Sequence, residues 1–179
     1  MGAAEARIVS SMLHSDYSVA VDLGCGPGKL APFIRDRVGH LIGVDQNLSQ
    51  LKRALRAGLY DKLVQADIRD YEPPAETQAI FMLEVIEHIP KEEGYALLDR
   101  LRTVPTVILS TPERFIRAGG HICAWTRHEL EELGFLSLYA RMPWTQELFY
   151  GRSIIAIRSV DANYRLADYA GQTARLIPV

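Results

Sequence analysis

The chain has 179 residues, of which 48% are hydrophobic and 23% charged, and its formal net charge is −2. This length and balance favour one globular domain and exclude a disordered chain, and the small net charge gives no global indication of a nucleic-acid or membrane partner. No stretch approaches the roughly 20 apolar residues of a membrane span, and the N-terminus lacks a signal-peptide pattern. The two cysteines, Cys25 and Cys123, form neither a disulfide framework nor a zinc site, so we expect a cytoplasmic protein.

Short apolar runs alternate with helical patterns along most of the chain. We predict helices at 3–14, 29–38, 91–102 and 127–133, a further helix that begins after Asn47 or Ser49 and ends at Gly58, and strands at 19–23, 41–44, 62–66, 79–83, 104–109, 135–142 and 153–158. Asn47 or Ser49 suits the start of the third helix and Gly58 its end, Gly39 suits the end of the second helix, and Thr126 with Glu129 forms a capping-box pattern before the last helix. We expect Tyr95 of the helix at 91–102 to face the interior.

This alternation predicts parallel βαβ units in a doubly wound α/β sheet. A loop at 143–151, rather than a helix, joins the last two strands, which suits an antiparallel pair at one edge. We expect residues 1–160 to form one domain with an N-terminal helix, and residues 161–179 to form a polar, weakly patterned tail that is loose.

The first strand ends in a glycine-rich turn. Asp22 interrupts the apolar run 19–23, where a charge is costly unless it has a role. Gly24, Gly26 and Gly28 follow, and glycine permits positive φ and a close approach of a ligand to the backbone. Cys25 is interpreted as a small residue in this tight turn.

Three further strands end directly in an acid: Asp45, Asp67 and Glu84. In a doubly wound sheet these ends lie on one edge, where ligands bind. Asp45 follows the glycines by about 20 residues, the distance at which an acid reaches ribose hydroxyls. The glycines lack the GxGxxG spacing of a nicotinamide site.

The motifs together resemble class I S-adenosylmethionine-dependent methyltransferases over roughly residues 17–158. They read Asp22-Leu23-Gly24-Cys25-Gly26-Pro27-Gly28, Gly43-Val44-Asp45, Gln65-Ala66-Asp67-Ile68 and Glu84-Val85-Ile86-Glu87-His88-Ile89. The resemblance implies a three-layer αβα Rossmann-like fold of seven strands with an antiparallel last strand, and S-adenosylmethionine as the cofactor, with S-adenosylhomocysteine as its product.

The resemblance also implies a role for each matching residue. Asp22 and the backbone of Gly24, Cys25 and Gly26 would hold the methionine moiety, Asp45 the ribose, Gln46, Asp67 and Ile68 the adenine, and the backbone at Glu84 the methionine end.

Glu87, His88 and the later His121 are the candidate catalytic residues, because two acids and a histidine leave the fourth strand on one turn. The small-RNA 2′-O-methyltransferases show a similar Glu-x-x-Glu-His segment and a histidine before Trp-Thr-Arg, as in 121–127, and they bind a divalent metal. Many small-molecule methyltransferases carry similar segments without one. Our interpretation is that these residues line the acceptor pocket and bind no metal, with a divalent metal as the alternative.

The stretch 111–128 is rich in cations, which are Arg114, Arg117, His121, Arg127 and His128. An anionic acceptor is one interpretation of this loop, and an ordinary solvated surface is the other. Trp125 and Trp144 either wall the acceptor pocket or pack in the core.

We therefore expect methyl transfer to oxygen or nitrogen of a small molecule. A metal-dependent RNA 2′-O-methyltransferase is a second hypothesis, less favoured because the sequence lacks a strongly basic surface. A non-catalytic, cofactor-binding partner subunit is a third.

Overall fold

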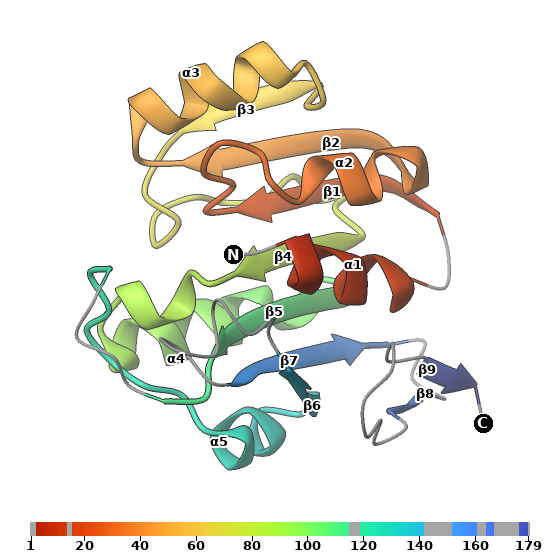
Figure 1. Ribbon diagram of the computed structural model, residues 1–179, viewed down its shortest axis with the longest axis vertical. Coiled ribbons are helices and arrows are strands. Elements are labelled where there is room, and N and C mark those ends of the chain that lie inside the picture. The colour runs from red at the N-terminus through yellow and green to blue at the C-terminus, as the bar shows by residue number, and fades with distance from the viewer. Residues whose placement is uncertain are drawn as a thin grey trace.

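The computed structural model describes residues 3–13, 16–114, 119–141, 152–160, 164–166 and 176–178 (Figure 1). Its helices are α1 (Ala3–Ser11), α2 (Ala31–Ile34), α3 (Leu48–Ala57), α4 (Lys91–Arg100) and α5 (Arg127–Glu132), with short 3₁₀ turns η1 (Arg35–Arg37), η2 (Ile86–His88) and η3 (Leu101–Thr103). Its strands are β1 (Tyr17–Leu23), β2 (Val38–Asp45), β3 (Lys62–Gln65), β4 (Ala79–Leu83), β5 (Thr106–Pro112), β6 (Leu136–Arg141), β7 (Arg152–Ser159), β8 (Tyr164–Leu166) and β9 (Leu176–Pro178).

Seven strands form one sheet in the order β3-β2-β1-β4-β5-β7-β6. Strand β7 runs antiparallel to both β5 and β6, whereas the pairs from β3 to β5 are parallel. Successive side chains of each strand face opposite layers, so that Ala20 packs with α1 and α2 while Val21 packs with α4 and α5. The predicted three-layer Rossmann-like fold with an antiparallel last strand is therefore confirmed.

Helix α1 lies over the middle of the sheet, in front of β4 and β5 (Figure 1). Its apolar residues Ala6 and Val9 are fully buried, and Met12 and Leu13 continue the same face beyond its end. Glu5 lies on this buried face as well, with only 1% of its surface exposed. A carboxyl group there requires a polar environment, which the end of β4 supplies.

The helix predicted at 29–38 was too long. Only one α turn forms, followed by η1, and Gly39 lies inside β2 instead of ending a helix. Arg35 explains the early stop, because its guanidinium donates to the carbonyl oxygens of Val38 (2.8 Å) and Gly39 (3.1 Å) and to Asp61 (2.7 Å). These bonds turn the chain from η1 directly into β2.

Helix α3 begins and ends as predicted, with Asn47 accepting from two backbone N–H groups and Gly58 at φ +66°. Of its apolar residues, Leu51 and Ala54 are buried, whereas Leu48 and Leu55 are 48% and 69% exposed. Tyr95 of α4, expected inside, is 37% exposed and lies against the Trp125 ring.

The end of the chain contains a separate two-stranded sheet of β8 and β9. The boundary at residue 160 and the loose tail remain predictions, since the rest of 161–179 lies outside the described residues, as do the predicted loop at 143–151 and Trp144. None of the described helices is both long and apolar enough to cross a bilayer.

Candidate active site

The carboxyl ends of the parallel strands meet at one edge of the sheet. The arrowheads of β1, β4 and β5 all point to the left in Figure 1, and β7 points the other way. Strand β2 pairs with one edge of β1, and β4 pairs with its other edge. The order of the strands in the sheet therefore reverses beside β1. Ligands of open α/β sheets bind at such a switch point.

The glycine turn after β1 is shaped by its two neighbours at this edge. Gly24, Gly26 and Gly28 have φ of +73°, +54° and +83°. The N–H groups of Gly24 and Cys25 donate to the Val44 carbonyl at 2.8 and 3.0 Å. A Cβ on Gly24 would lie 2.5 Å from the nearest methyl carbon of Val85, so the turn and the segment after β4 are in close contact. Burial raises the pKa of the Cys25 thiol well above its usual range, which agrees with a packing role.

Asp22 is buried beneath the turn and has a partner that the sequence did not indicate. Its Oδ2 accepts a 2.7 Å hydrogen bond from the Tyr60 hydroxyl. Burial raises the pKa of Asp22 to about 7, the charge of Asp45 adds to the rise, and the Tyr60 hydrogen bond opposes it. The Tyr60 ring fits because Gly28 and Gly43 leave room for it. Asp22 therefore gains or loses its charge near neutral pH.

Asp45 is held at the edge by backbone groups. Its Oδ2 accepts from Gly26 N at 2.8 Å and its Oδ1 from Asn47 N at 2.7 Å. An ionised carboxylate offers about four lone-pair positions, so both oxygens can still accept from a ligand. The neighbouring Gln46 is exposed, and its carbonyl accepts from the Gln65 amide at 3.3 Å.

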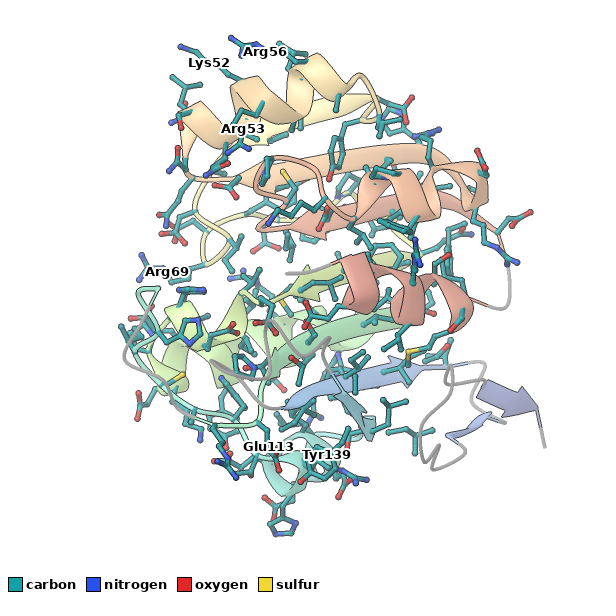
Figure 2. The ribbon with its side chains drawn as sticks, viewed as in Figure 1. Lys52, Arg53, Arg56, Arg69, Glu113 and Tyr139 are labelled. Atoms are coloured by element: carbon teal, nitrogen blue, oxygen red, sulfur yellow. The ribbon has the colours of Figure 1, made fainter. Side chains whose placement is uncertain are left out.

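Asp67 is engaged by Arg69, a second residue that the sequence did not indicate. Asp67 accepts from the backbone N and Nε of Arg69, both at 2.9 Å, and from its Nη2 at 2.5 Å, and these bonds lower the pKa of Asp67. Arg69 also bonds Glu93 at 2.7 Å, and Figure 2 shows Arg69 at the carboxyl edge. The Ile68 carbonyl accepts from Arg100 at 3.1 Å.

Glu84 has φ +58°, a conformation that no other non-glycine residue in the described part of the chain adopts. Such a residue is rare and is often held at a functional site by its surroundings. Its N–H donates to the Ser110 carbonyl at 3.0 Å, and its Oε1 accepts from the hydroxyls of Ser110 (3.4 Å) and Ser153 (3.5 Å). The carboxyl is thereby directed towards β5 and β7.

Glu5 of α1 lies close to Glu84. Burial raises the pKa of Glu84 to about 10, and the charges of Glu5 and Glu87 contribute. The sequence pattern did not single out Glu5 as a site residue, although one signal was present. An acid four residues before Val9 lies on the same face of the predicted helix as that apolar residue.

The three candidate catalytic residues are brought together as predicted. Nε2 of His88 and of His121 lie 4.0 and 3.9 Å from Glu87 Oε1, and the two rings meet edge to face. The potential ligand atoms of all three lie within 4.8 Å of one another, a group that does not include Glu84. Glu87 is 1% exposed, and neither of its oxygens accepts a hydrogen bond of good geometry from the described residues. Burial raises the pKa of Glu87 to about 7 and lowers that of His121.

The loop cations do not converge on one point. Arg127 bonds Ser137 at 2.9 Å and Glu131 at 3.1 Å, and His128 is exposed beside Glu132. Arg117 lies outside the described residues. Trp125 is fully buried with its Nε1 donating to the Ile86 carbonyl at 3.4 Å, so the core interpretation is confirmed for it.

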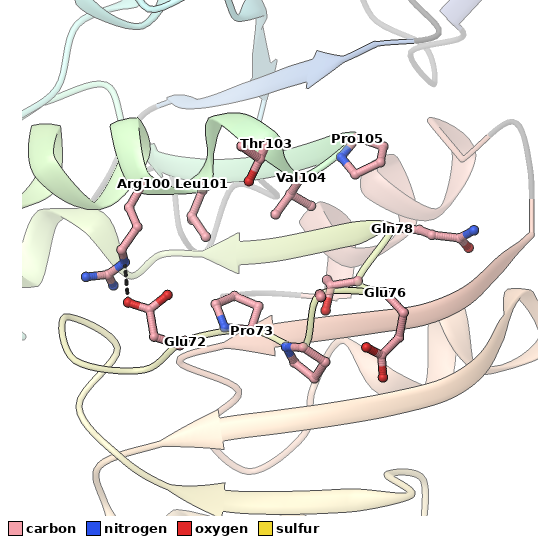
Figure 3. A pocket seen from close by; sticks show the side chains of 12 residues that line it. Glu72, Pro73, Glu76, Gln78, Arg100, Leu101, Thr103, Val104 and Pro105 are labelled. Atoms are coloured by element: carbon pink, nitrogen blue, oxygen red, sulfur yellow. Dashed lines mark ion pairs between the residues drawn. The ribbon is translucent and has the colours of Figure 1, made fainter.

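A hollow of about 450 Å³ opens at the opposite edge of the sheet, before β4 and β5 begin (Figure 3). An ion pair between Arg100 and Glu72 crosses it, and Pro73 and Pro105 help to line it. None of the candidate site residues line this hollow, so we place the active site elsewhere.

The profile of a family described as a methyltransferase domain matches residues 20–105, which carry the glycine turn and all the acidic strand ends. Residues 20–105 thus form a methyltransferase domain, as the resemblance to the class I S-adenosylmethionine-dependent methyltransferases implied. Curated relatives of the chain include trans-aconitate 2-methyltransferase of Azoarcus sp. (strain BH72), 27% identical over 88% of this chain and 58% of that protein. The enzyme of the same name from Enterobacter sp. (strain 638) is 29% identical over 54% of this chain and 38% of that protein. The chain thus spans less than two thirds of the length of these relatives.

Solved methyltransferase structures share the fold. The N-methyltransferase NodS from Bradyrhizobium japonicum WM9, in complex with S-adenosylhomocysteine, has a TM-score of 0.67 at 15% identity, covering 84% of this chain and 82% of that one. The methyltransferase domain of a bacterial Hen1 protein has a TM-score of 0.62 at 21% identity, covering 87% and 96%.

Proposed function

We propose that this methyltransferase transfers a methyl group from S-adenosylmethionine to oxygen or nitrogen of a small molecule. The observation that carries the proposal is the convergence of the glycine turn, Asp22 and Asp45 at the switch point beside β1. The relatives named trans-aconitate 2-methyltransferase support a small-molecule acceptor.

The donor would lie along the ends of β1, β2 and β3. Asp22 and the glycine turn face the amino acid end of the donor, and Asp45 accepts from the ribose hydroxyls. Asp67, Gln46 and Ile68 lie at the adenine end. Because Arg69 already bonds Asp67, adenine would share that carboxylate with the guanidinium.

Bound S-adenosylmethionine supplies an activated methyl group, so the protein mainly has to align the acceptor and exclude water. Glu87 can take a proton from the acceptor near neutral pH, because burial has brought its pKa to about 7. His88 and His121 lie close enough to Glu87 to orient the acceptor or to pass the proton on.

Calorimetry with S-adenosylhomocysteine tests this function. We expect the wild type to bind it, the Asp45→Asn variant to bind at least about tenfold more weakly because the ribose loses a charged acceptor, and the exposed Asp36→Asn control to match the wild type. Absence of any binding by the wild type contradicts the proposal. Transfer of labelled methyl to pooled small molecules then separates an enzyme from a non-catalytic binding subunit.

A metal-assisted RNA 2′-O-methyltransferase is a second candidate, favoured by the grouping of Glu87, His88 and His121. One carboxylate and two neutral imidazoles suit a divalent cation such as Mn²⁺ or Zn²⁺. Lys52, Arg53 and Arg56 project from α3 and would serve an RNA backbone (Figure 2).

The Mn²⁺ signal in electron paramagnetic resonance tests this candidate directly. Stoichiometric Mn²⁺ binding that His121→Ala abolishes, together with labelled-methyl transfer to RNA that a chelator stops, supports it. Full transfer activity in the presence of a chelator rules it out. The exposed His128→Ala is the matched control.

An anionic acceptor is one of the two interpretations of the loop cations, and Arg114 is the described arginine that can test it, since Arg127 and His128 pair with Glu131 and Glu132 on α5. Loss of methyl transfer to carboxylate or phosphate acceptors in Arg114→Gln supports an anionic acceptor. Unchanged transfer leaves Arg114 as an ordinary surface residue.

A further inference from the structure

We propose that Arg69 sets the base specificity of the methyl-donor site, because it presents Asp67 to the 6-amino group of adenine as a hydrogen-bond acceptor of fixed direction. This inference rests on the proposed function and deepens it, since it names what distinguishes the adenine of the methyl donor from other purines. Arg69 acts through Asp67 and is therefore a positioning residue.

The carboxylate of Asp67 is almost filled by Arg69. Its Oδ1 accepts from the backbone N and Nε of Arg69, both at 2.9 Å, and its Oδ2 accepts from Nη2 at 2.5 Å. An ionised carboxylate has about four lone-pair positions, two for each oxygen. The bonds from the described residues therefore leave a single acceptor position, on Oδ2, for a ligand.

Helix α4 fixes Arg69 in turn. Glu93 Oε2 accepts from Nη1 of Arg69 at 2.7 Å, and Nη1 of Arg100 donates to the Arg69 carbonyl at 2.6 Å. Arg100 also donates to the Ile68 carbonyl at 3.1 Å, so the loop after β3 is tied to the same helix. The side chain of Arg69 is 43% exposed, so these bonds rather than close packing hold it. Contacts with α4 thereby set the direction in which Asp67 accepts.

An acceptor of fixed direction distinguishes purines by the group at position 6. Adenine carries an amino group there, which donates a hydrogen bond to a carboxylate, whereas hypoxanthine carries a carbonyl oxygen, which a carboxylate repels. The bonds from Arg69 lower the pKa of Asp67, so the carboxyl has no proton to donate to that oxygen. The two bonds from the guanidinium also keep Asp67 from rotating away from an unfavourable base. A site built on such a bond rejects the analogue that cannot form it.

Calorimetry with S-adenosylhomocysteine and S-inosylhomocysteine tests this inference without knowledge of the methyl acceptor. The two ligands differ only in the base, so the ratio of their dissociation constants measures base recognition. We expect the wild type to bind S-adenosylhomocysteine at least about tenfold more tightly than S-inosylhomocysteine. A wild-type ratio near one overturns the proposal.

Variants of Arg69 assign the preference to its guanidinium. In Arg69→Gln the ratio should fall by at least about threefold, because Asp67 keeps only the bond from the backbone N. A general loosening of the loop would weaken both ligands alike and leave the ratio unchanged. An unchanged ratio, or tighter binding of S-adenosylhomocysteine by Arg69→Gln, overturns the proposal. The exposed Arg102→Gln, which removes an ion pair with Asp99, is the matched control and should equal the wild type.

Arg69→Lys decides the question if Arg69→Gln does not fold, as judged by circular dichroism. Lysine keeps the charge but lacks the planar fork of donors, so the ratio should again fall, and an unchanged ratio overturns the proposal. Asp67→Asn should lower the ratio as well, because an amide can donate to the hypoxanthine oxygen. An unchanged ratio in Asp67→Asn removes Asp67 from the base site and overturns the inference.

The two proposals fail in different ways. Absence of binding of both ligands by the wild type contradicts the proposed function and the inference with it. Binding of S-adenosylhomocysteine with a ratio that Arg69→Gln leaves unchanged overturns the inference alone.

Discussion

The Tyr60 hydroxyl donates a 2.7 Å hydrogen bond to Asp22 Oδ2, joining the loop before β3 to the acid beneath the glycine turn. Burial raises the pKa of Asp22 to about 7, and this bond limits the rise because it stabilises the ionised carboxylate. Tyr60 thus helps to decide whether Asp22 is charged at neutral pH.

Replacement of Tyr60 by Phe should raise the pKa of Asp22 further. The donor's ammonium group prefers the ionised carboxylate, so affinity for S-adenosylmethionine rises with pH through the pKa of Asp22. In Tyr60→Phe this rise should move to higher pH, with weaker binding near pH 7 and recovery above it. Dissociation constants measured as a function of pH check this shift, with Tyr95→Phe as the control; coincident curves for wild type and Tyr60→Phe contradict it.

Replacement of Gly24 by Ala should damage the turn more than the same change at Gly26. Both residues have positive φ, which costs an alanine about 1–2 kcal/mol. At Gly24 the new Cβ would also lie 2.5 Å from Val85, adding about 1–3 kcal/mol of overpacking, whereas nothing lies within 4 Å at Gly26.

Urea unfolding of the two glycine variants measures this difference. The double variant Gly24→Ala/Val85→Ala should recover the overpacking part, because the clashing methyl groups are removed. Equal stability of the two single variants is the result that would count against the described contact.

Replacement of Glu84 by Gln should flatten the pH dependence of stability. Glu84 keeps its proton in the folded protein up to about pH 10, against 4.5 for an ordinary glutamate. The unfolded chain therefore binds fewer protons between these values, so the free energy of unfolding falls as pH rises, by up to about 1.4 kcal/mol per pH unit for one group.

Chemical unfolding of the metal-free protein between pH 5 and pH 9 measures this slope. Glu84→Gln should show a shallower fall than the wild type, and Glu76→Gln the same fall. A steeper fall in Glu84→Gln contradicts the assigned direction of the shift.

Replacement of Thr126 by Ala should lower stability without changing donor binding. Thr126 Oγ1 accepts from Glu129 N at 3.2 Å, and Glu129 Oε2 accepts from Thr126 N at 2.8 Å, which caps α5. Loss of such a cap costs about 1 kcal/mol. Thermal unfolding and calorimetry on the same sample check both parts, and a changed affinity for S-adenosylhomocysteine contradicts the second.

The sequence by itself determined the features that depend on neighbouring residues. The Asn47 cap, Gly58 and the Thr126–Glu129 capping box were predicted correctly because their bonds close within three or four residues. The doubly wound α/β class was predicted from the alternation of apolar runs with helical patterns.

Only the tertiary structure decided which distant side chains meet at the carboxyl edge. Tyr60 reaches Asp22, Arg69 reaches Glu93 and Glu5 lies close to Glu84, and each of these depends on how two elements pack. The short α2 has the same origin, since Arg35 ends it through bonds to residues already in β2 and to Asp61. Local pattern shows that a residue is polar or lies on a helix face, but burial and long-range packing decide its partner, its charge and so its chemistry.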